Sequence, residues 1–194
     1  PAPPTPLDAA GADNEAGRAG AVEQVAQAYR AVAAALTERA EKVAGTTMGE
    51  VLEATAAMAS DPELIGEAKT RVLAGQEPSF AVDHATKEYI DLFTAAGGYL
   101  AERVTDLRSV RDRVIAKITG QPEPGVPELA VPSIVVAEDL SPADTATLDL
   151  DKVLAIIIEQ GGPTGHTAII AGQLGIPCIV RVAGAEDLFN GQIV

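Results

Sequence analysis

A glycine-rich turn that carries one histidine is the part of this sequence best suited to chemistry. From Glu159 to Ile170 the chain reads Glu-Gln-Gly-Gly-Pro-Thr-Gly-His-Thr-Ala-Ile-Ile, and His166 stands where a helical pattern begins. The first amides of a helix have no acceptor within the helix and attract anions. The same environment disfavours a protonated imidazole, so we expect a neutral, nucleophilic ring. A neutral histidine beside free amides can take up and hold a phosphoryl group.

The neighbouring residues complete a candidate phosphate site. Gly165 has no β-carbon, so the backbone can approach a bound group closely, and Thr164 and Thr167 add hydroxyl donors. We therefore assign His166 to catalysis and these three residues to phosphate binding. A structural histidine in a glycine-rich turn is the alternative, and residue spacing alone leaves both interpretations open.

The turn is expected to lie in a small α/β layer over residues 121–194. Val153–Ile158 is a nearly continuous apolar run typical of a buried strand, and it ends just before the turn. Shorter β-branched runs at 134–137 and 178–182 predict two more strands, with a helix over about 167–174 between the last two. Strands that alternate with helices indicate an α/β layer, in which function gathers at the carboxyl ends of the strands.

Residues 21–120 are expected to form an all-helical bundle. Apolar residues recur at steps of three and four over 22–43, which indicates a long first helix. Thr47 is predicted as the N-cap of a second helix, Asp61-Pro62 starts a third, and Gly97-Gly98 breaks a fourth.

Two Pro- and Gly-rich segments bound these parts. Residues 1–20 lack apolar periodicity and are predicted to be a linker or ragged terminus, and residues 121–125 mark the boundary between the two parts. The expected fold class is therefore α plus α/β.

Composition limits the kinds of partner, compartment and metal site that fit this protein. A formal charge of −14 argues against nucleic acid and favours either a basic protein partner or simple solubility. The single cysteine, Cys178, fits a reducing, cytoplasmic compartment, and no apolar run is long enough to insert in a membrane. With His84 as the only other histidine, no metal site is expected. A start at Pro1 suggests a fragment of a longer protein.

Three segments together resemble one family. Gly161–Ala171, followed by Leu174–Pro177, closely resembles the phosphohistidine signature of phosphoenolpyruvate-utilising enzymes. Asp61–Leu64 is similar to that family's E-D-P-E-L turn, and Asp139–Thr145 to its D-L-T-P-S-x-T stretch. Over about 21–182 the chain resembles the N-terminal domain of enzyme I of the sugar phosphotransferase system.

This resemblance implies a function and a site. The histidine that matches His166 accepts a phosphoryl group from phosphoenolpyruvate and donates it to a histidine of HPr, a small phosphocarrier protein. A threonine that matches Thr145 hydrogen-bonds the imidazole. The helical part is an HPr-docking subdomain inserted in a swivelling α/β phosphohistidine domain. Thr55 and Arg108 match family positions at the docking helix and near the subdomain interface, and both are expected to contact the partner. Glu53, Glu63 and Glu67, on the second and third predicted helices, are further candidate contacts, with an ordinary acidic helix surface as the alternative.

The resemblance also implies what lies outside this chain. Phosphoenolpyruvate and Mg²⁺ bind a C-terminal barrel domain that these residues do not include, and a homodimer of the full-length enzyme forms through that domain. The fragment is expected to exchange phosphoryl with HPr and not to react with phosphoenolpyruvate alone.

The chain departs from the family at several points. Gly172 stands where the family's M-A-R-S-L motif has arginine, Thr55 stands where a docking helix has histidine, and a Gly-rich first strand is missing. Two alternatives remain open. One is the phosphohistidine domain of a pyruvate phosphate dikinase or phosphoenolpyruvate synthase, which usually has Cys where Gly165 stands. The other is a non-catalytic partner-binding module.

Overall fold

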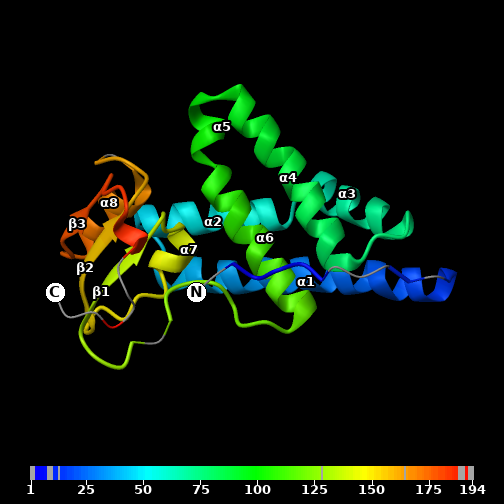
Figure 1. Cartoon of the computed structure of the whole chain (residues 1–194), viewed down its shortest axis with the longest axis horizontal. Helices are drawn as coiled ribbons and strands as arrows, with labels where there is room; N and C mark the ends of the chain where they lie inside the picture. The colour runs from blue at the N-terminus through cyan, green and yellow to red at the C-terminus, as the bar shows by residue number, and fades with distance from the viewer. Residues whose placement is uncertain are drawn as a thin grey trace. The chain divides into compact units, whose positions relative to one another are not determined.

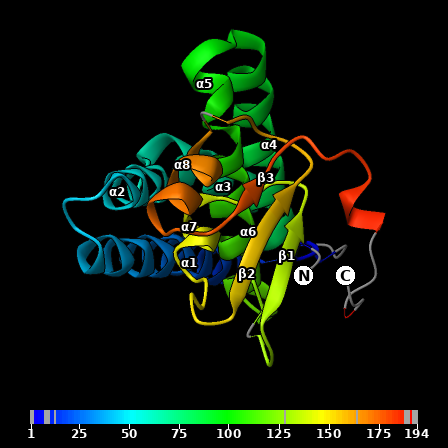
Figure 2. The ribbon, with the colours of Figure 1, turned by 90° about the vertical axis from the view of Figure 1, so that its left-hand side faces the viewer.

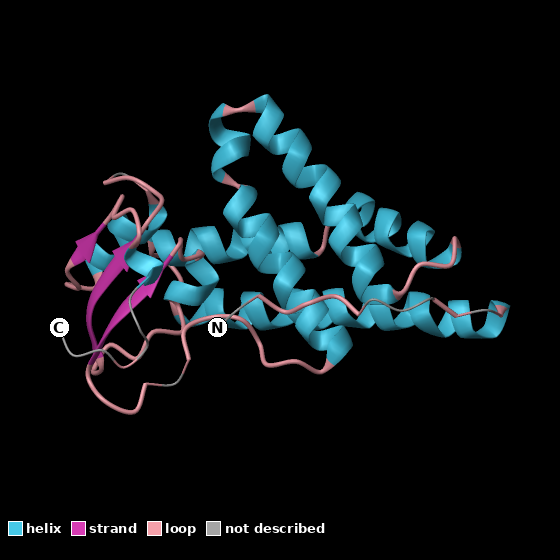
Figure 3. Cartoon of the chain, viewed as in Figure 1, coloured by secondary structure: helices cyan, strands magenta, loops and turns pink. Residues whose placement is uncertain are grey.

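The structure is a computed structural model that describes residues 3–7, 11–12, 14–127, 129–163, 165–187 and 191. The chain divides into two compact units, one running through Pro124 and the other beginning at Gly125. Helices make up the first unit, and the strands lie in the second (Figure 3). The expected α plus α/β fold class is confirmed.

The helical unit is organised around its long first helix (Figure 1). This helix contacts four of the others, namely the second, third, fourth and sixth. It begins at Glu15, because the Asn14 side chain accepts a hydrogen bond from the Gly17 amide. The prediction of a linker through residue 20 is therefore wrong for its last six residues. The helices are α1 (Glu15–Lys42), α2 (Thr47–Ala59), α3 (Pro62–Leu73), α4 (Pro78–Ala96), α5 (Gly98–Glu102) and α6 (Val104–Thr119).

Local sequence signals set most helix ends. Oδ1 of Asp61 accepts from the amides of Glu63 and Leu64 at 2.8 and 2.9 Å, which confirms the predicted start of α3. The cap of α2 is Thr46 rather than Thr47, since the Thr46 hydroxyl accepts from the Gly49 amide. Gly97 adopts φ +69 between α4 and α5, a conformation that favours glycine.

The second unit is a parallel three-stranded sheet among the residues described (Figure 2). Strand order is β1-β2-β3, and both pairings are parallel. The core of this unit packs Val135, Ile156, Ile158 and Ala171 together. The strands and helices are β1 (Ser133–Ala137), α7 (Pro142–Thr145), β2 (Val153–Ile158), α8 (His166–Gln173) and β3 (Cys178–Ile179), followed by a short 3₁₀ turn at Ala185–Asp187. Because the strands are parallel, the loops that leave their carboxyl ends share one edge of the sheet.

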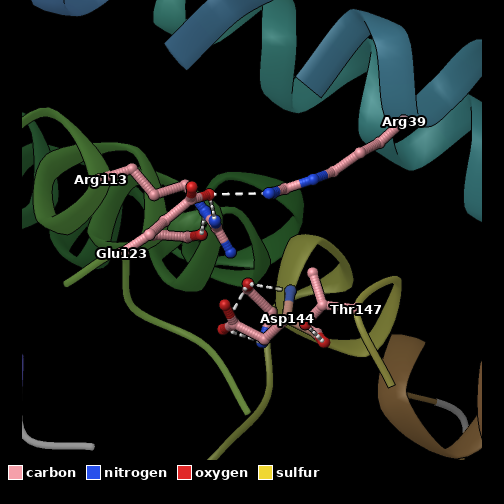
Figure 4. A network of polar contacts seen from close by, with 7 residues as sticks. Arg39, Arg113, Glu123, Asp144 and Thr147 are labelled. Atoms are coloured by element: carbon pink, nitrogen blue, oxygen red, sulfur yellow. Dashed lines mark hydrogen bonds and ion pairs between the residues drawn. The ribbon is translucent and has the colours of Figure 1, made fainter. Parts of the chain in front are cut away.

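Two arginines hold the end of the helical unit. Glu123, just beyond α6, accepts a hydrogen bond from Nη2 of Arg39 on α1 at 2.8 Å and pairs with Nη1 of Arg113 on α6 (Figure 4). The Arg113 side chain is only 2% exposed. Burial acts to raise the pKa of Glu123, but the hydrogen bond and charge of Arg39, with the charges of Arg113 and Lys117, outweigh it and lower the pKa.

Replacing this carboxylate should destabilise the helical unit. We expect Glu123→Gln to lower the free energy of unfolding at pH 7 by about 1–2 kcal/mol, because Arg113 loses its charged partner. The loss is no larger because solvent screens the half-exposed carboxylate. A carboxyl with a lowered folded-state pKa contributes stability above its ordinary value of 4.5 and loses it as the pH falls through the lowered value. The difference between the two proteins should therefore vanish under strongly acidic conditions. Urea titrations of both across this range measure it, with Glu38→Gln on the exposed face of α1 as the unaffected control.

Candidate phosphohistidine site

His166 is the first residue of α8 and is partly exposed to solvent. Ile169 is the first residue of the helix whose amide finds a backbone acceptor, the Gly165 carbonyl at 3.0 Å, and no side chain caps the helix. Within the described residues, the amides of His166, Thr167 and Ala168 therefore have no acceptor. An imidazole that reaches solvent next to unbonded amides is the arrangement that phosphoryl binding requires.

Glycines shape the loop that delivers the chain from β2 to this helix. Gly161 adopts φ +80, which favours glycine. The Gly165 amide donates to the Gly162 carbonyl at 2.9 Å, and a β-carbon at position 165 would lie 3.1 Å from that oxygen. Gly165 thus shapes the turn but does not offer its own amide to a phosphate. Thr164, predicted as a phosphate donor, lies outside the described residues.

The Thr167 side chain points into the unit rather than toward a bound phosphate group. Its side chain is buried, and its hydroxyl donates to the Leu140 carbonyl at 2.9 Å. The expectation that this hydroxyl binds phosphate is therefore wrong for this structure, because its proton is committed inside the unit. The bond instead fastens the start of α8 to the loop that follows β1. A hydrogen bond from the Gln160 amide to the Glu138 carbonyl, at 2.9 Å, joins the loops after β1 and β2 in the same way.

Thr145 lies on α7, which packs against α8. Ser141 and Asp144 form a reciprocal capping box that starts α7, and the Thr147 hydroxyl donates to the Asp144 carbonyl at 2.7 Å (Figure 4). The Thr145 hydroxyl is buried and donates to the Ser141 carbonyl at 2.9 Å. In the described part of the chain, no hydrogen bond joins it to His166.

Arg181 is a residue of this edge that the sequence analysis did not select. It follows β3, and its Nε donates to the Gly161 carbonyl at 3.1 Å. Its φ of +62 is unusual for a residue other than glycine. Its place two residues after a strand of the same sheet was the available signal, since loops at the carboxyl ends of parallel strands lie together.

The predicted partner contacts have mixed surroundings. Glu53, Glu63 and Arg108 are exposed, and Glu67 is partly buried and pairs with Arg71 at 3.0 Å. The prediction for Thr55 is wrong, because its side chain is 0% exposed and its hydroxyl donates to a carbonyl of its own helix.

An apolar pocket with a negative rim lies on the helical unit. Met58, Leu64, Phe93 and Leu107 supply its apolar lining, with Asp61 and Tyr89 beside them. Burial raises the pKa of Tyr89, and so do the negative charges of four carboxylates on and beside α3 and α4, those of Glu63, Asp61, Glu67 and Glu88. This combination of apolar surface and negative potential suits a partner with a basic rim.

Neither a metal-binding cluster nor a membrane-spanning helix is found among the described residues. No group of three or more His, Cys, Asp or Glu side chains there is placed to hold a metal ion. The His84 ring lies tilted against the Phe80 ring, with the centroids 4.2 Å apart. Burial raises the pKa of the Cys178 thiol. No helix in that part of the chain has the length and apolar character of a membrane span.

Two family descriptions match the chain. The description "PEP-utilising enzyme, N-terminal" matches residues 5–103, and "PEP-utilising enzyme, mobile domain" matches residues 129–194. The mobile-domain match contains the whole of the His166 turn.

Several similar proteins bear the same name. The chain is 43% identical over 192 residues to phosphoenolpyruvate-protein phosphotransferase of Streptomyces coelicolor, covering 99% of this chain and 33% of that protein. It is 36% identical over 156 residues to the protein of the same name from Enterococcus faecalis, covering 79% and 27%. The chain thus spans about a third of the length of the curated relatives it matches.

Solved structures share the fold. A solution structure of enzyme I (nEIt) superposes with a TM-score of 0.69 at 28% identity, over 96% of this chain and 78% of that one. The N-terminal domain of Enzyme 1 - Nitrogen gives a TM-score of 0.62 at 24% identity, over 91% and 74%, which supports the fold alone.

Proposed function

Because the chain belongs to the family of phosphoenolpyruvate-utilising enzymes, we propose that it is the N-terminal part of a phosphoenolpyruvate-protein phosphotransferase and that His166 carries the phosphoryl group. The observation that carries this proposal is the partly exposed imidazole at the first position of α8, next to amides without acceptors. The relatives' names support the reaction class, and the helical unit supports a protein partner.

The proposed transfer conserves charge and atoms. A lone pair on one ring nitrogen of His166 attacks the phosphorus of a phosphohistidine on the partner. The phosphorus–nitrogen bond of the donor breaks, and its electron pair returns to the donor ring. That ring leaves as neutral imidazole when its other nitrogen carries a proton. The amides at the start of α8 stabilise the charge on the phosphoryl oxygens, and the reverse reaction follows the same path.

Thr145 is proposed to orient the imidazole. Its hydroxyl proton is committed to the Ser141 carbonyl, but Oγ1 keeps lone pairs that can accept an N–H from the ring. Accepting that hydrogen bond would keep the ring proton on the nitrogen that faces Thr145. The other ring nitrogen would then hold the lone pair that attacks phosphorus. The packing of α7 against α8 supports this role.

The partner is proposed to be HPr, and its docking surface the apolar pocket with its carboxylate rim. The net charge of −14 and the four carboxylates around Tyr89 favour a basic partner. Phosphoenolpyruvate, Mg²⁺ and dimer contacts are assigned to the part of the protein beyond this chain, and the location to the cytoplasm.

Phosphorylation by phospho-HPr tests the proposed function. The isolated chain should gain one phosphoryl group, labile to acid and stable to alkali, and peptide mapping should place it on His166. Phosphoenolpyruvate and Mg²⁺ alone should not phosphorylate the chain. Tight binding of HPr without transfer would instead favour the non-catalytic module, and neither binding of HPr nor transfer from phospho-HPr would favour a dikinase-type domain.

The carboxylate rim should speed association with HPr. Glu63→Gln removes the carboxylate that raises the pKa of Tyr89 most, so that pKa should fall toward its ordinary value. We expect the association rate constant to fall about twofold to fivefold at low ionic strength and the difference to disappear in concentrated salt. Stopped-flow mixing and ultraviolet titration measure the two effects. Glu38→Gln, on α1, is the matched control, and equal rates for both variants would remove Glu63 from the docking surface.

A further inference from the structure

Arg181 brings a positive charge to the loop that precedes His166. Its Nε donates to the Gly161 carbonyl at 3.1 Å, and its Nη2 lies 3.6 Å from the place that a β-carbon at Gly162 would occupy. The Gly162 carbonyl in turn accepts the amide of Gly165, the residue before His166. The guanidinium is therefore held against the loop whose hydrogen bond positions the histidine.

We propose that Arg181 binds the phosphoryl group while it is attached to His166. This inference rests on the proposed function and adds a residue to that site. The bond from Nε to the Gly161 carbonyl leaves both terminal nitrogens of the guanidinium for other acceptors, and in the described part of the chain Arg181 makes no other hydrogen bond or ion pair. Those nitrogens present parallel N–H groups that match two oxygens of a phosphate.

Acidic residues lie in the loops at the same edge of the sheet as Arg181. The loops that follow β1 and β2 carry the carboxylates of Glu138, Asp139 and Glu159. Each of these negative charges disfavours a phosphate dianion nearby. Helix α8 contains no lysine or arginine of its own. Arg181, on the loop after β3, is the cation that the fold brings to the same edge.

The conformation of Arg181 provides a discriminating variant. Its φ of +62 is one that glycine adopts without strain, so Arg181→Gly should leave the folded unit at least as stable. Arg181→Gly also removes the bond to the Gly161 carbonyl, so a role only in holding the loop would lower transfer by a similar factor at low and at high ionic strength. A phosphoryl-binding role predicts a loss that is larger at low ionic strength, although the fold survives.

The test compares Arg181→Gln, Arg181→Gly and Arg181→Lys with Lys152→Gln. Lys152 precedes β2, at the opposite edge of the sheet, and its loss changes the charge of the unit by the same amount. Each protein is equilibrated with phospho-HPr, and the fraction of phosphorylated chain and the half-life of the isolated phosphoprotein are measured at low ionic strength and at about 0.5 M salt.

We expect the Gln and Gly variants to shift the equilibrium toward HPr by about threefold to tenfold at low ionic strength, with a smaller difference in salt. Arg181→Lys should recover part of the loss, because it keeps the charge without the paired N–H groups, and Lys152→Gln should match the unmodified chain. If the Gln and Gly variants match Lys152→Gln, the role of Arg181 is overturned and the proposed function stands. If the unmodified chain takes up no phosphoryl group, the proposed function fails, and this role fails with it.

Discussion

His166→Ala should abolish phosphoryl uptake from phospho-HPr, with the rate falling by more than about a thousandfold. The side chain supplies the attacking nitrogen, and no other group of α8 can replace it, since the helix otherwise presents hydroxyl, apolar and amide side chains. The fold should survive, because the ring is partly exposed and makes no hydrogen bond to another described residue. Incorporation of labelled phosphate, resolved over time, measures the loss.

The matched control is His84→Ala. His84 is the other histidine of the chain and lies on α4 against the Phe80 ring. This variant should take up the phosphoryl group at the rate of the unmodified chain. Acid-labile phosphate retained by His166→Ala and lost by His84→Ala would place the phosphohistidine on the helical unit and contradict the site proposed here.

The largest expected loss of stability follows from Asp106→Ala. Asp106 is 1% exposed in the first turn of α6, and its Oδ2 lies 2.9 Å from Nη1 of Arg103, itself 5% exposed. The Arg103 guanidinium also lies 5.7 Å from the centre of the Tyr99 ring. Removing the carboxylate leaves a buried cation without its charged partner, which costs about 3–5 kcal/mol of unfolding free energy. Urea unfolding followed by circular dichroism measures the change.

Two further variants separate charge from packing at this pair. Arg103→Met combined with Asp106→Leu should recover most of the loss, because neither buried charge remains. Glu23→Ala removes the carboxylate of the exposed pair between Glu23 and Arg30 and should leave stability unchanged. A single Asp106→Ala variant as stable as Glu23→Ala would show that Arg103 reaches water and that the pair contributes little.

Two ion pairs of the helical unit differ in whether the sequence alone could predict them. Arg103 and Asp106 are three residues apart on one helical turn, so their pairing follows from helix geometry. Glu123 pairs with Arg39 from 84 positions away, and no local rule predicts that bond. The proline and glycine content of residues 121–125 predicts a boundary segment. The attachment of this segment to α1 depends on how the helices of the bundle pack.

Signals that lie within a short stretch of sequence predict local structure correctly, because they depend on the local backbone. The Asp61 cap, the break at Gly97 and the turn from Gly161 to Gly165 each follow from hydrogen bonds or dihedral angles within a few residues. The placement of His166 at the first position of α8 belongs to the same class. Such features need no knowledge of the rest of the chain.

The sequence by itself therefore determined the two-part organisation, the aliphatic helices and strands, and the histidine that starts a helix after a buried strand. Only the tertiary structure decided which of the predicted site residues are buried and which distant residue reaches the turn. It turned Thr55 and Thr167 inward and brought Arg181 beside Gly161. The physical reason is that helix and turn formation are local, while the direction of a side chain depends on which distant segments pack against it.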